Sequence, residues 1–161
     1  TLQLQVIIET HGDYSQSDLV AETMDLVPSP SVGVLWDTHH PWRFHDEPLE
    51  LTYTRLADRV IHTHWKDSVS WAAVHQKAVS TGAAEQAHSL MSGHRHADYV
   101  LFGGGEFPIL DCLALLNDGG YDGWYSYEWE KMWHPEIESP ELAFPMFPGK
   151  LRRLHATLGS S

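Results

Sequence analysis

The sequence predicts an α/β fold with a parallel β-sheet, of about the size of half a (β/α)8 barrel. Two observations predict it: strand-like and helix-like segments alternate along the chain, and a polar residue closes each strand-like segment. Repeating βα units give parallel strands joined by right-handed crossovers. A complete barrel takes about 250 residues, whereas this chain has 161. We therefore expect one domain over residues 1–161, containing about four βα units.

The predicted strands are short runs rich in β-branched and aromatic residues. Such runs, bounded by polar or turn residues, are typical of buried parallel strands. The Val and Ile content of the first run favours a buried strand in particular. The four runs are residues 2–10, 31–37, 60–65 and 124–129.

Helices are predicted between the strands from apolar spacing and from start and stop signals. Ser15 or Ser17 can cap the first helix. Pro48 lies near the first turn of the second, where its missing N–H is harmless, and Gly119 ends the third. Prolines between residues 135 and 148 are expected to interrupt any helix before Lys150. The expected helices end at Val27, Val60, Asn117 and Leu158.

Residues 67–106 break the alternation, because Ser, Ala, Gly and His dominate them without sustained periodicity. A connection of this length is usually functional or partly disordered. Residues 103–105 are three glycines, which we expect to form a flexible turn, because no GK[ST] motif of a phosphate loop follows them. The histidines of residues 93–96 are expected to be exposed to solvent.

Composition excludes several classes of protein. No apolar run approaches the roughly 18 residues that a membrane span needs. The formal net charge of −12 repels phosphate backbones, so nucleic acid is not an expected partner. Cys112 is the single cysteine, which excludes an internal disulfide and fits a reducing compartment such as the cytoplasm. Twelve His and seven Trp favour metal or polar small-molecule chemistry.

Each predicted strand ends with a residue that can bind a metal ion. These residues are Glu9, Asp37, His64 and Glu128. Because strand C-termini of a barrel converge on one mouth, we expect the four side chains to lie together. Three carboxylates and an imidazole suit one divalent ion, with Mn²⁺ favoured over Mg²⁺, Co²⁺ or Zn²⁺. The alternative, that such residues face solvent or cap a helix, is disfavoured because all four strands end alike.

Three residues beside the proposed ligands are candidates for binding a substrate. Lys66 can contact a substrate oxygen or phosphate, and a salt bridge to a carboxylate is the alternative. Trp36 and Trp65 can wall a sugar pocket, although core packing explains them nearly as well. His62 shares a strand face with His64, so spacing alone does not choose between the two histidines.

Six motifs together resemble the sugar phosphate isomerase/epimerase family, the xylose-isomerase-like TIM-barrel group that includes ketose 3-epimerases and inosose dehydratases. The motifs are residues 9–13 (ETHGD), 34–41 (VLWDTHHP), 61–68 (IHTHWKDS), 103–108 (GGGEFP), 120–124 (GYDGW) and 128–130 (EWE). The resemblance covers nearly the whole chain and matches the C-terminal half of the family's barrel. It implies a (β/α)8 TIM barrel of which this chain forms about the last four βα units.

The resemblance also implies roles for individual residues. The implied metal ligands are Glu9, Asp37, His64 and Glu128. His40 matches the family's substrate-contacting histidine, and the family pattern selects His64 over His62. His62 would then lie one layer deeper, as a packed barrel residue.

The implied chemistry is isomerisation or epimerisation of a sugar, sugar phosphate or polyol ketone through an enediolate. In the family's epimerases, the carboxylates matching Glu9 and Glu128 face opposite sides of the substrate, so that one removes a proton and the other returns it. Loss of hydroxide after the same first step gives an inosose-type dehydratase instead. Ser70 stands where the epimerases carry an arginine, a departure from that subgroup.

Other readings of the chain differ in function or completeness. Endonuclease IV-like phosphodiesterases share the fold but need a basic groove, which the net charge opposes. The alternative is a half-barrel that serves only as a metal-binding or assembly module and is inactive on its own. Because an isolated four-stranded parallel sheet has two raw edges and one uncovered face, we expect an N-terminal half-barrel or a second copy, and a homo-oligomer, to complete it.

Overall fold

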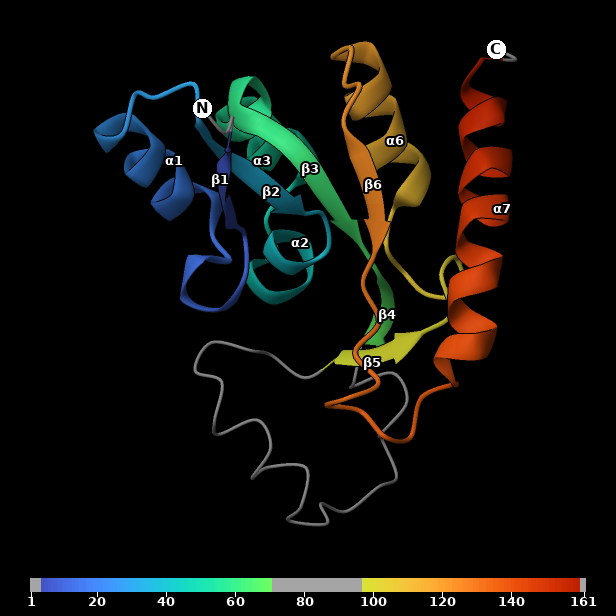
Figure 1. Cartoon of the computed structure of the whole chain (residues 1–161). Coiled ribbons are helices and arrows are strands. Elements are labelled where there is room, and N and C mark those ends of the chain that lie inside the picture. The colour runs from blue at the N-terminus through green and yellow to red at the C-terminus, as the bar shows by residue number, and fades with distance from the viewer. Residues whose placement is uncertain (1–3, 71–96, 160–161) are drawn as a thin grey trace.

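The protein is described by a computed structural model that covers residues 4–70 and 97–159. Four parallel strands form one sheet, ordered along the sheet as they are along the chain (Figure 1). They are β1 (Val6–Glu9), β2 (Val32–Asp37), β3 (Val60–Trp65) and β6 (Trp124–Tyr127). The predicted parallel α/β architecture is therefore confirmed.

Four helices cover one face of this sheet. They are α1 (Ser17–Leu26), α3 (Leu49–Leu56), α6 (Ile109–Asp118) and α7 (Pro140–Leu158). Each contributes residues to the hydrophobic core, which also contains Val34, Trp36, Val60 and Trp65 from the sheet. None of the helices in residues 4–70 and 97–159 is both long and apolar enough to cross a membrane.

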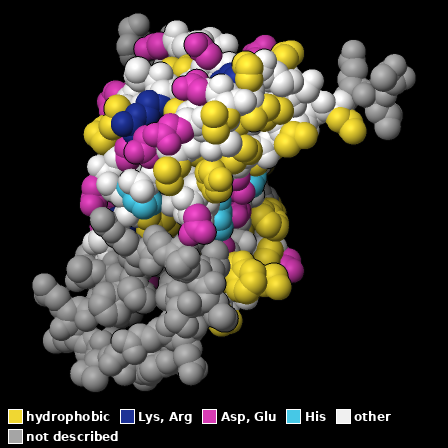
Figure 2. All heavy atoms as spheres, turned by 90° about the vertical axis from the view of Figure 1, so that its left-hand side faces the viewer, with side chains coloured by type: hydrophobic (Ala, Val, Ile, Leu, Met, Phe, Trp, Pro, Cys, Tyr) yellow, Lys and Arg dark blue, Asp and Glu magenta, His cyan; other side chains and the backbone are white. Residues whose placement is uncertain are grey.

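The two faces of the sheet differ because side chains alternate along each strand. Trp36 pairs with Thr63 in the β2–β3 register, and Asp37 pairs with His64. The first pair therefore faces the helices, and the second faces the opposite side. On that opposite side Trp124 is 76% exposed and Ile7 38% exposed. Figure 2, which views the molecule from the α1 and β1 side, shows hydrophobic side chains beside histidines and carboxylates.

Three shorter elements were not predicted. The helix α2 (His40–His45) follows β2 directly, with Pro41 in its first turn. The strands β4 (Asp67–Ser70) and β5 (Ala97–Val100) form an antiparallel pair beyond the C-terminal end of β3. The segment 67–106 was expected to be irregular, so its ends are more ordered than predicted, while residues 71–96, including the histidines of 93–96, lie outside the described part. Two 3-10 turns, η1 (Gly12–Tyr14) and η2 (Ala57–Arg59), complete the fold.

The last helix corrects a second expectation. α7 begins at Pro140 and contains Pro145 and Pro148, so the prolines do not delay the helix to Lys150. A proline inside a helix removes a backbone hydrogen bond and usually costs stability. Here packing outweighs this cost, because Ala143 and Phe147 lie on the buried side of the same helix turns.

The first strand is shorter and more exposed than predicted. β1 covers only Val6–Glu9, and residues 1–3 lie outside the described part. It is an edge strand that pairs with β2 alone, so Val6 is 62% exposed and the expectation of a buried strand is wrong for the described chain. β6 likewise ends at Tyr127, two residues before the predicted end.

Candidate metal centre

The C-terminal ends of the four parallel strands bring the predicted ligands together. Glu9 and Asp37 are the last residues of β1 and β2, and His64 lies one residue before the end of β3. Glu128 follows β6, where its backbone N–H donates to the Trp65 carbonyl at 3.0 Å. One potential ligand atom from each of these residues lies within 4.8 Å of the others. The sequence predicted that these four side chains lie together, because consecutive parallel strands end at the same edge of a sheet.

His64 lies between two carboxylates. Its Nδ1 is 2.8 Å from Oε1 of Glu9 and 3.2 Å from Oε2 of Glu128. Burial would lower the pKa of His64, but the hydrogen bonds and charges of Glu128 and Glu9 outweigh burial and raise the pKa to about 10. The imidazolium thus supplies positive charge at a place where carboxylates converge.

Asp37 is fully buried at the floor of this cluster. Its Oδ1 accepts backbone N–H groups of His39 at 2.9 Å and His40 at 3.1 Å, and its Oδ2 lies 2.9 Å from Nζ of Lys66. Burial would raise the pKa of Asp37, but the Lys66 ammonium and His39 outweigh burial and lower it. A buried carboxylate held ionised and in a fixed orientation is suited to bind a cation.

The donor set fits a divalent ion. Carboxylate oxygens with one imidazole nitrogen are ligands for ions such as Mn²⁺, Mg²⁺ and Zn²⁺. Glu9, His64 and Glu128 are only partly buried, with side-chain exposures of 30%, 23% and 27%, so the cluster is open on the side away from the helices. An ion could therefore enter from that side.

His40 and Lys66, the two residues predicted to contact a substrate, lie buried among the groups of the centre, and their contact with a substrate stays a prediction. Both side chains have no exposed area. Nζ of Lys66 lies 3.0 Å from Nε2 of His40, 2.7 Å from Oε2 of Glu128 and 2.8 Å from Oε1 of Glu130. The salt-bridge alternative therefore describes Lys66. The two residues hold the carboxylates in place from behind.

Trp36 and Trp65 are core residues, so the prediction that they wall a substrate pocket is wrong. Both are fully buried on the helix side of the sheet, opposite Asp37 and His64. The Trp65 indole N–H donates to the hydroxyl of Thr63 at 2.8 Å. Alternation along the strands places each tryptophan on the face that its neighbouring ligand does not use.

His62 lies one layer below His64 on the same face, as the resemblance implied. The two rings are 5.6 Å apart, and Nε2 of His62 is 2.6 Å from the hydroxyl of Ser126. Burial and the charge of His64 lower the pKa of His62, against the opposing charge of Glu9. It therefore packs within the sheet and is not grouped with the four converging ligands.

Glycines 103–105 form an ordered turn around a carboxylate. Asp67 Oδ2 accepts the backbone N–H groups of Gly103 and Gly105, each at 2.9 Å, and Oδ1 accepts that of Phe107 at 3.1 Å. Gly103 has φ +75°, and a Cβ on Gly105 would lie 2.3 Å from Asp67 Oδ1. The turn needs glycine to approach this side chain closely. Its N–H groups thus bind an internal carboxylate, so the structure does not support a phosphate loop.

Two further residues beside the centre were missed in the sequence. His11 and Glu130 lie with His40 in a second group whose potential ligand atoms are within 4.8 Å of one another. Each lies two residues after a predicted ligand: His11 follows Glu9, and Glu130 follows Glu128. Because residues two apart in extended chain share a face, this spacing is the signal that could have found them.

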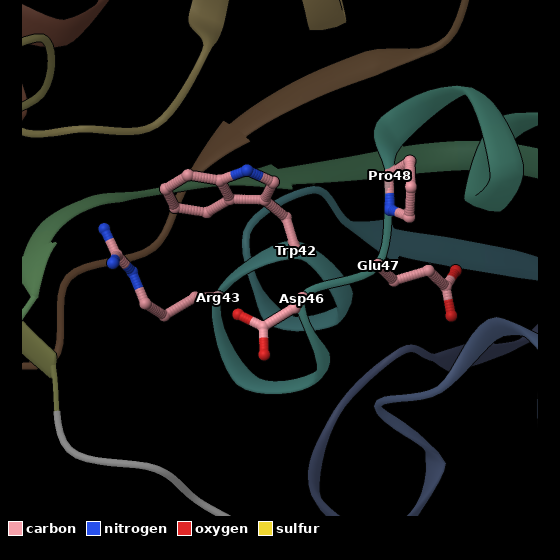
Figure 3. A pocket seen from close by; sticks show the side chains of 5 residues that line it. All are labelled: Trp42, Arg43, Asp46, Glu47 and Pro48. Atoms are coloured by element: carbon pink, nitrogen blue, oxygen red, sulfur yellow. The ribbon is translucent and has the colours of Figure 1, made fainter.

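The described part also has a pocket away from this cluster. Its lining comes from α2 and the segment that leads to α3 (Figure 3), namely Trp42, Arg43, Asp46, Glu47 and Pro48. The guanidinium of Arg43 lies over the Trp42 ring at 4.3 Å from its centre, and it pairs with Glu106 at 2.9 Å. None of the four converging residues lines this pocket.

The family described as xylose isomerase-like TIM barrel matches residues 1–144. The chain belongs to this family. Its parallel sheet with helices on one side is therefore part of a TIM-barrel fold, as the sequence resemblance predicted. The centre lies at the C-terminal end of the strands, where TIM-barrel enzymes have their active sites.

Curated relatives and solved structures agree with this assignment. Over 112 residues, the chain is 26% identical to inosose dehydratase from Lacticaseibacillus casei, covering 67% of this chain and 34% of the relative. A xylose isomerase domain protein from Planctomyces limnophilus superposes with a TM-score of 0.58 and 20% identity, over 95% of this chain and 46% of that one. The probable 3-DHS dehydratase AsbF from Bacillus anthracis superposes with a TM-score of 0.56 and 20% identity, over 78% of this chain and 43% of that one. The chain spans about a third of the length of the curated relative.

Metal binding at this centre is expected to release a proton at neutral pH. His64 keeps its proton in the metal-free chain because its pKa is raised to about 10, and a metal ligand must be deprotonated. The affinity of the centre for the metal ion should therefore rise about tenfold per pH unit as the pH increases toward 10. Calorimetric titration at pH 7 in two buffers with different ionisation enthalpies measures the released proton. Metal binding without any proton release would contradict the assignment of His64 as a ligand.

Proposed function

We propose that this chain provides the metal-binding and proton-transfer part of a divalent-metal-dependent enzyme that acts on a sugar, sugar phosphate or polyol ketone. The observation that carries the proposal is the convergence of three carboxylates and an imidazole at the C-terminal edge of a parallel sheet. The proposed ligands are Glu9, Asp37, His64 and Glu128. Mn²⁺ is the favoured ion, because the donor set is rich in oxygen.

Two carboxylates of the centre are placed to move protons. A bound divalent ion supplies Lewis acidity, which makes the carbon beside a substrate carbonyl more acidic. Glu9 and Glu128 lie on either side of His64 and are partly exposed, so a substrate on the open side can reach both. Burial would raise the pKa of Glu128, but the hydrogen bond with His64 and the charge of Lys66 outweigh burial and lower it, so Glu128 is ionised at neutral pH and can accept a proton.

Residues behind the centre orient these groups. Asp37 is fixed by two backbone N–H groups and by Lys66. Lys66 also lies within 2.7 Å of Glu128, so the ammonium sets the position of one proposed proton-transfer group. Precise placement of reacting groups contributes to rate as directly as their chemical type.

The proposed first step leads to one of three outcomes. Return of the proton to the other face by the second carboxylate gives an epimer, and proton transfer between neighbouring carbons gives an isomer. Loss of hydroxide instead gives a dehydrated product. The dehydratase is the second candidate function, favoured by the curated relative, which is an inosose dehydratase.

A solvent-exchange experiment tests the proposed chemistry. We expect the metal-loaded protein to exchange a substrate C–H for deuterium in D2O, over a panel of ketoses and inososes, and to lose this exchange when the metal is chelated. Mass spectrometry separates an epimer or isomer, which differs from the substrate only by the incorporated deuterium, from a product that has lost water. Turnover without exchange would contradict the acid–base roles of Glu9 and Glu128, because it indicates transfer of hydride.

The surroundings of the centre are proposed as well. We propose that a half-barrel of preceding sequence, or a second copy in a homo-oligomer, covers the face that carries the exposed Ile7 and Trp124. The cytoplasm is the proposed location, because Cys112 is buried, unpaired and the single cysteine of the chain.

A further inference from the structure

We propose that the ammonium group of Lys66 takes the place of a second cation, so that the centre binds one divalent ion and not two. The inference rests on the metal site proposed above and deepens it, because it assigns the residue that sets the number of ions. Lys66 is a positioning residue in this account. It acts through the carboxylates that it contacts.

Three groups of potential ligands overlap at this edge of the sheet in the described part of the chain, and two of them matter here, because the third, Asp37, His39 and His40, shares Asp37 with one and His40 with the other. The first is the proposed site, and the second consists of His11, His40 and Glu130. His40 links them, since its Nδ1 lies 3.5 Å from Oδ2 of Asp37. Paired metal ions in two-metal enzymes lie about 3.5–4 Å apart, a spacing that adjacent groups of this kind can supply.

Lys66 contacts both groups at once. From the first group, Oδ2 of Asp37 is 2.9 Å and Oε2 of Glu128 is 2.7 Å from Nζ. From the second, Oε1 of Glu130 is 2.8 Å and Nε2 of His40 is 3.0 Å away. Four donors of electron pairs, three of them carboxylate oxygens, thus surround one nitrogen. This is the environment of a bound cation, provided here by a side chain.

Charge supports the same conclusion. The carboxylates of the two groups are Glu9, Asp37, Glu128 and Glu130. One divalent ion and the Lys66 ammonium leave a single negative charge in excess, whereas two divalent ions would balance the four carboxylates without the lysine. Because Lys66 has no exposed area, its charge is committed to these partners. A second ion beside it would meet a fixed positive charge and would have to share Asp37 and Glu128 with it.

Removal of the ammonium should therefore open a second ion site. We expect wild-type protein to hold about one Mn²⁺ per chain, and Lys66→Met, which keeps the length of the side chain without its charge, to hold about two. Adding Glu130→Gln to Lys66→Met should return the content to about one. Lys150→Met, at a lysine outside the centre, is the matched control and should leave the content unchanged.

Metal analysis after gel filtration of the full protein gives the ion content, and electron paramagnetic resonance shows whether two Mn²⁺ ions are spin-coupled. Lys66→Gln serves as a second variant if Lys66→Met does not fold. The electron paramagnetic resonance spectrum of the wild-type protein at saturating Mn²⁺ tests for a coupled pair without any variant. A coupled pair in wild type, or one ion in a folded Lys66 variant, would overturn the inference and leave the proposed site intact. Absence of any bound ion from wild type would overturn the proposed site, and the inference with it.

Discussion

Replacement of Glu128 by Gln is expected to lower turnover by about 10²–10⁴-fold, the usual effect of losing a general base. Gln keeps the shape of the side chain and one ligand oxygen, but it cannot accept the proton. Substrate binding should change far less than turnover, because the lost interaction forms during proton transfer. Steady-state kinetics with the substrate identified in the exchange panel, at saturating metal, measures both quantities.

The control for this substitution is Glu136→Gln, a carboxylate with 67% side-chain exposure that lies outside the four converging residues. It should leave turnover unchanged. If Glu128→Gln raised KM strongly and left kcat near the wild-type value, Glu128 would be a binding residue, and its proposed role in proton transfer would be wrong.

His64→Ala and Asp37→Ala are expected to abolish stoichiometric metal binding. Each removes a side chain that the structure places within 4.8 Å of the other three. The loss should exceed the roughly 10–100-fold that follows from substituting residues that only support metal ligands. Equilibrium dialysis with metal analysis measures the change, and His155→Ala, at an exposed position of α7, is the control. Full occupancy in both variants would contradict the assigned ligands.

Asp37 needs a second comparison, because its loss also affects Lys66. Removing one partner of a buried ion pair costs about 3–5 kcal/mol when the other charge is left uncompensated, and Asp37→Ala should cost less than this because Lys66 keeps Glu128 and Glu130 as partners. Asp37→Ala could therefore lower metal content by unfolding the protein. Denaturant unfolding of the metal-free variants separates the two causes, and His64→Ala avoids the problem because His64 is partly exposed.

Sequence reasoning succeeded where local pattern and topology agree. The strand over residues 60–65 was predicted with the bounds of β3, and helices near α1 and α6 were predicted from apolar spacing and stop signals. The predicted cap of the first helix is wrong, because Gln16, and neither Ser15 nor Ser17, is the N-cap of α1. The convergence of the four strand-end residues followed from topology alone, because consecutive parallel strands end at one edge.

Sequence reasoning failed where tertiary packing determines the conformation or burial of a segment. The prolines of residues 145 and 148 indicated a broken helix, yet burial of Phe147 holds α7 together through them. Trp36 and Trp65 have the composition of a sugar-binding wall, and only the strand register shows that they face the core. The burial of Lys66 among carboxylates from different strands is likewise not visible in the sequence, because His40 and Glu130 lie far from it along the chain.

Crystals of the full protein grown with Mn²⁺, with anomalous diffraction collected at the manganese edge, test the central claim most directly. The account predicts one anomalous peak per chain, within about 2.0–2.2 Å of oxygen or nitrogen atoms of Glu9, Asp37, His64 and Glu128. Lys66 should remain in contact with Asp37 beside that peak. A fully occupied peak at His11, His40 and Glu130, with the four predicted ligands left without metal, would contradict the account.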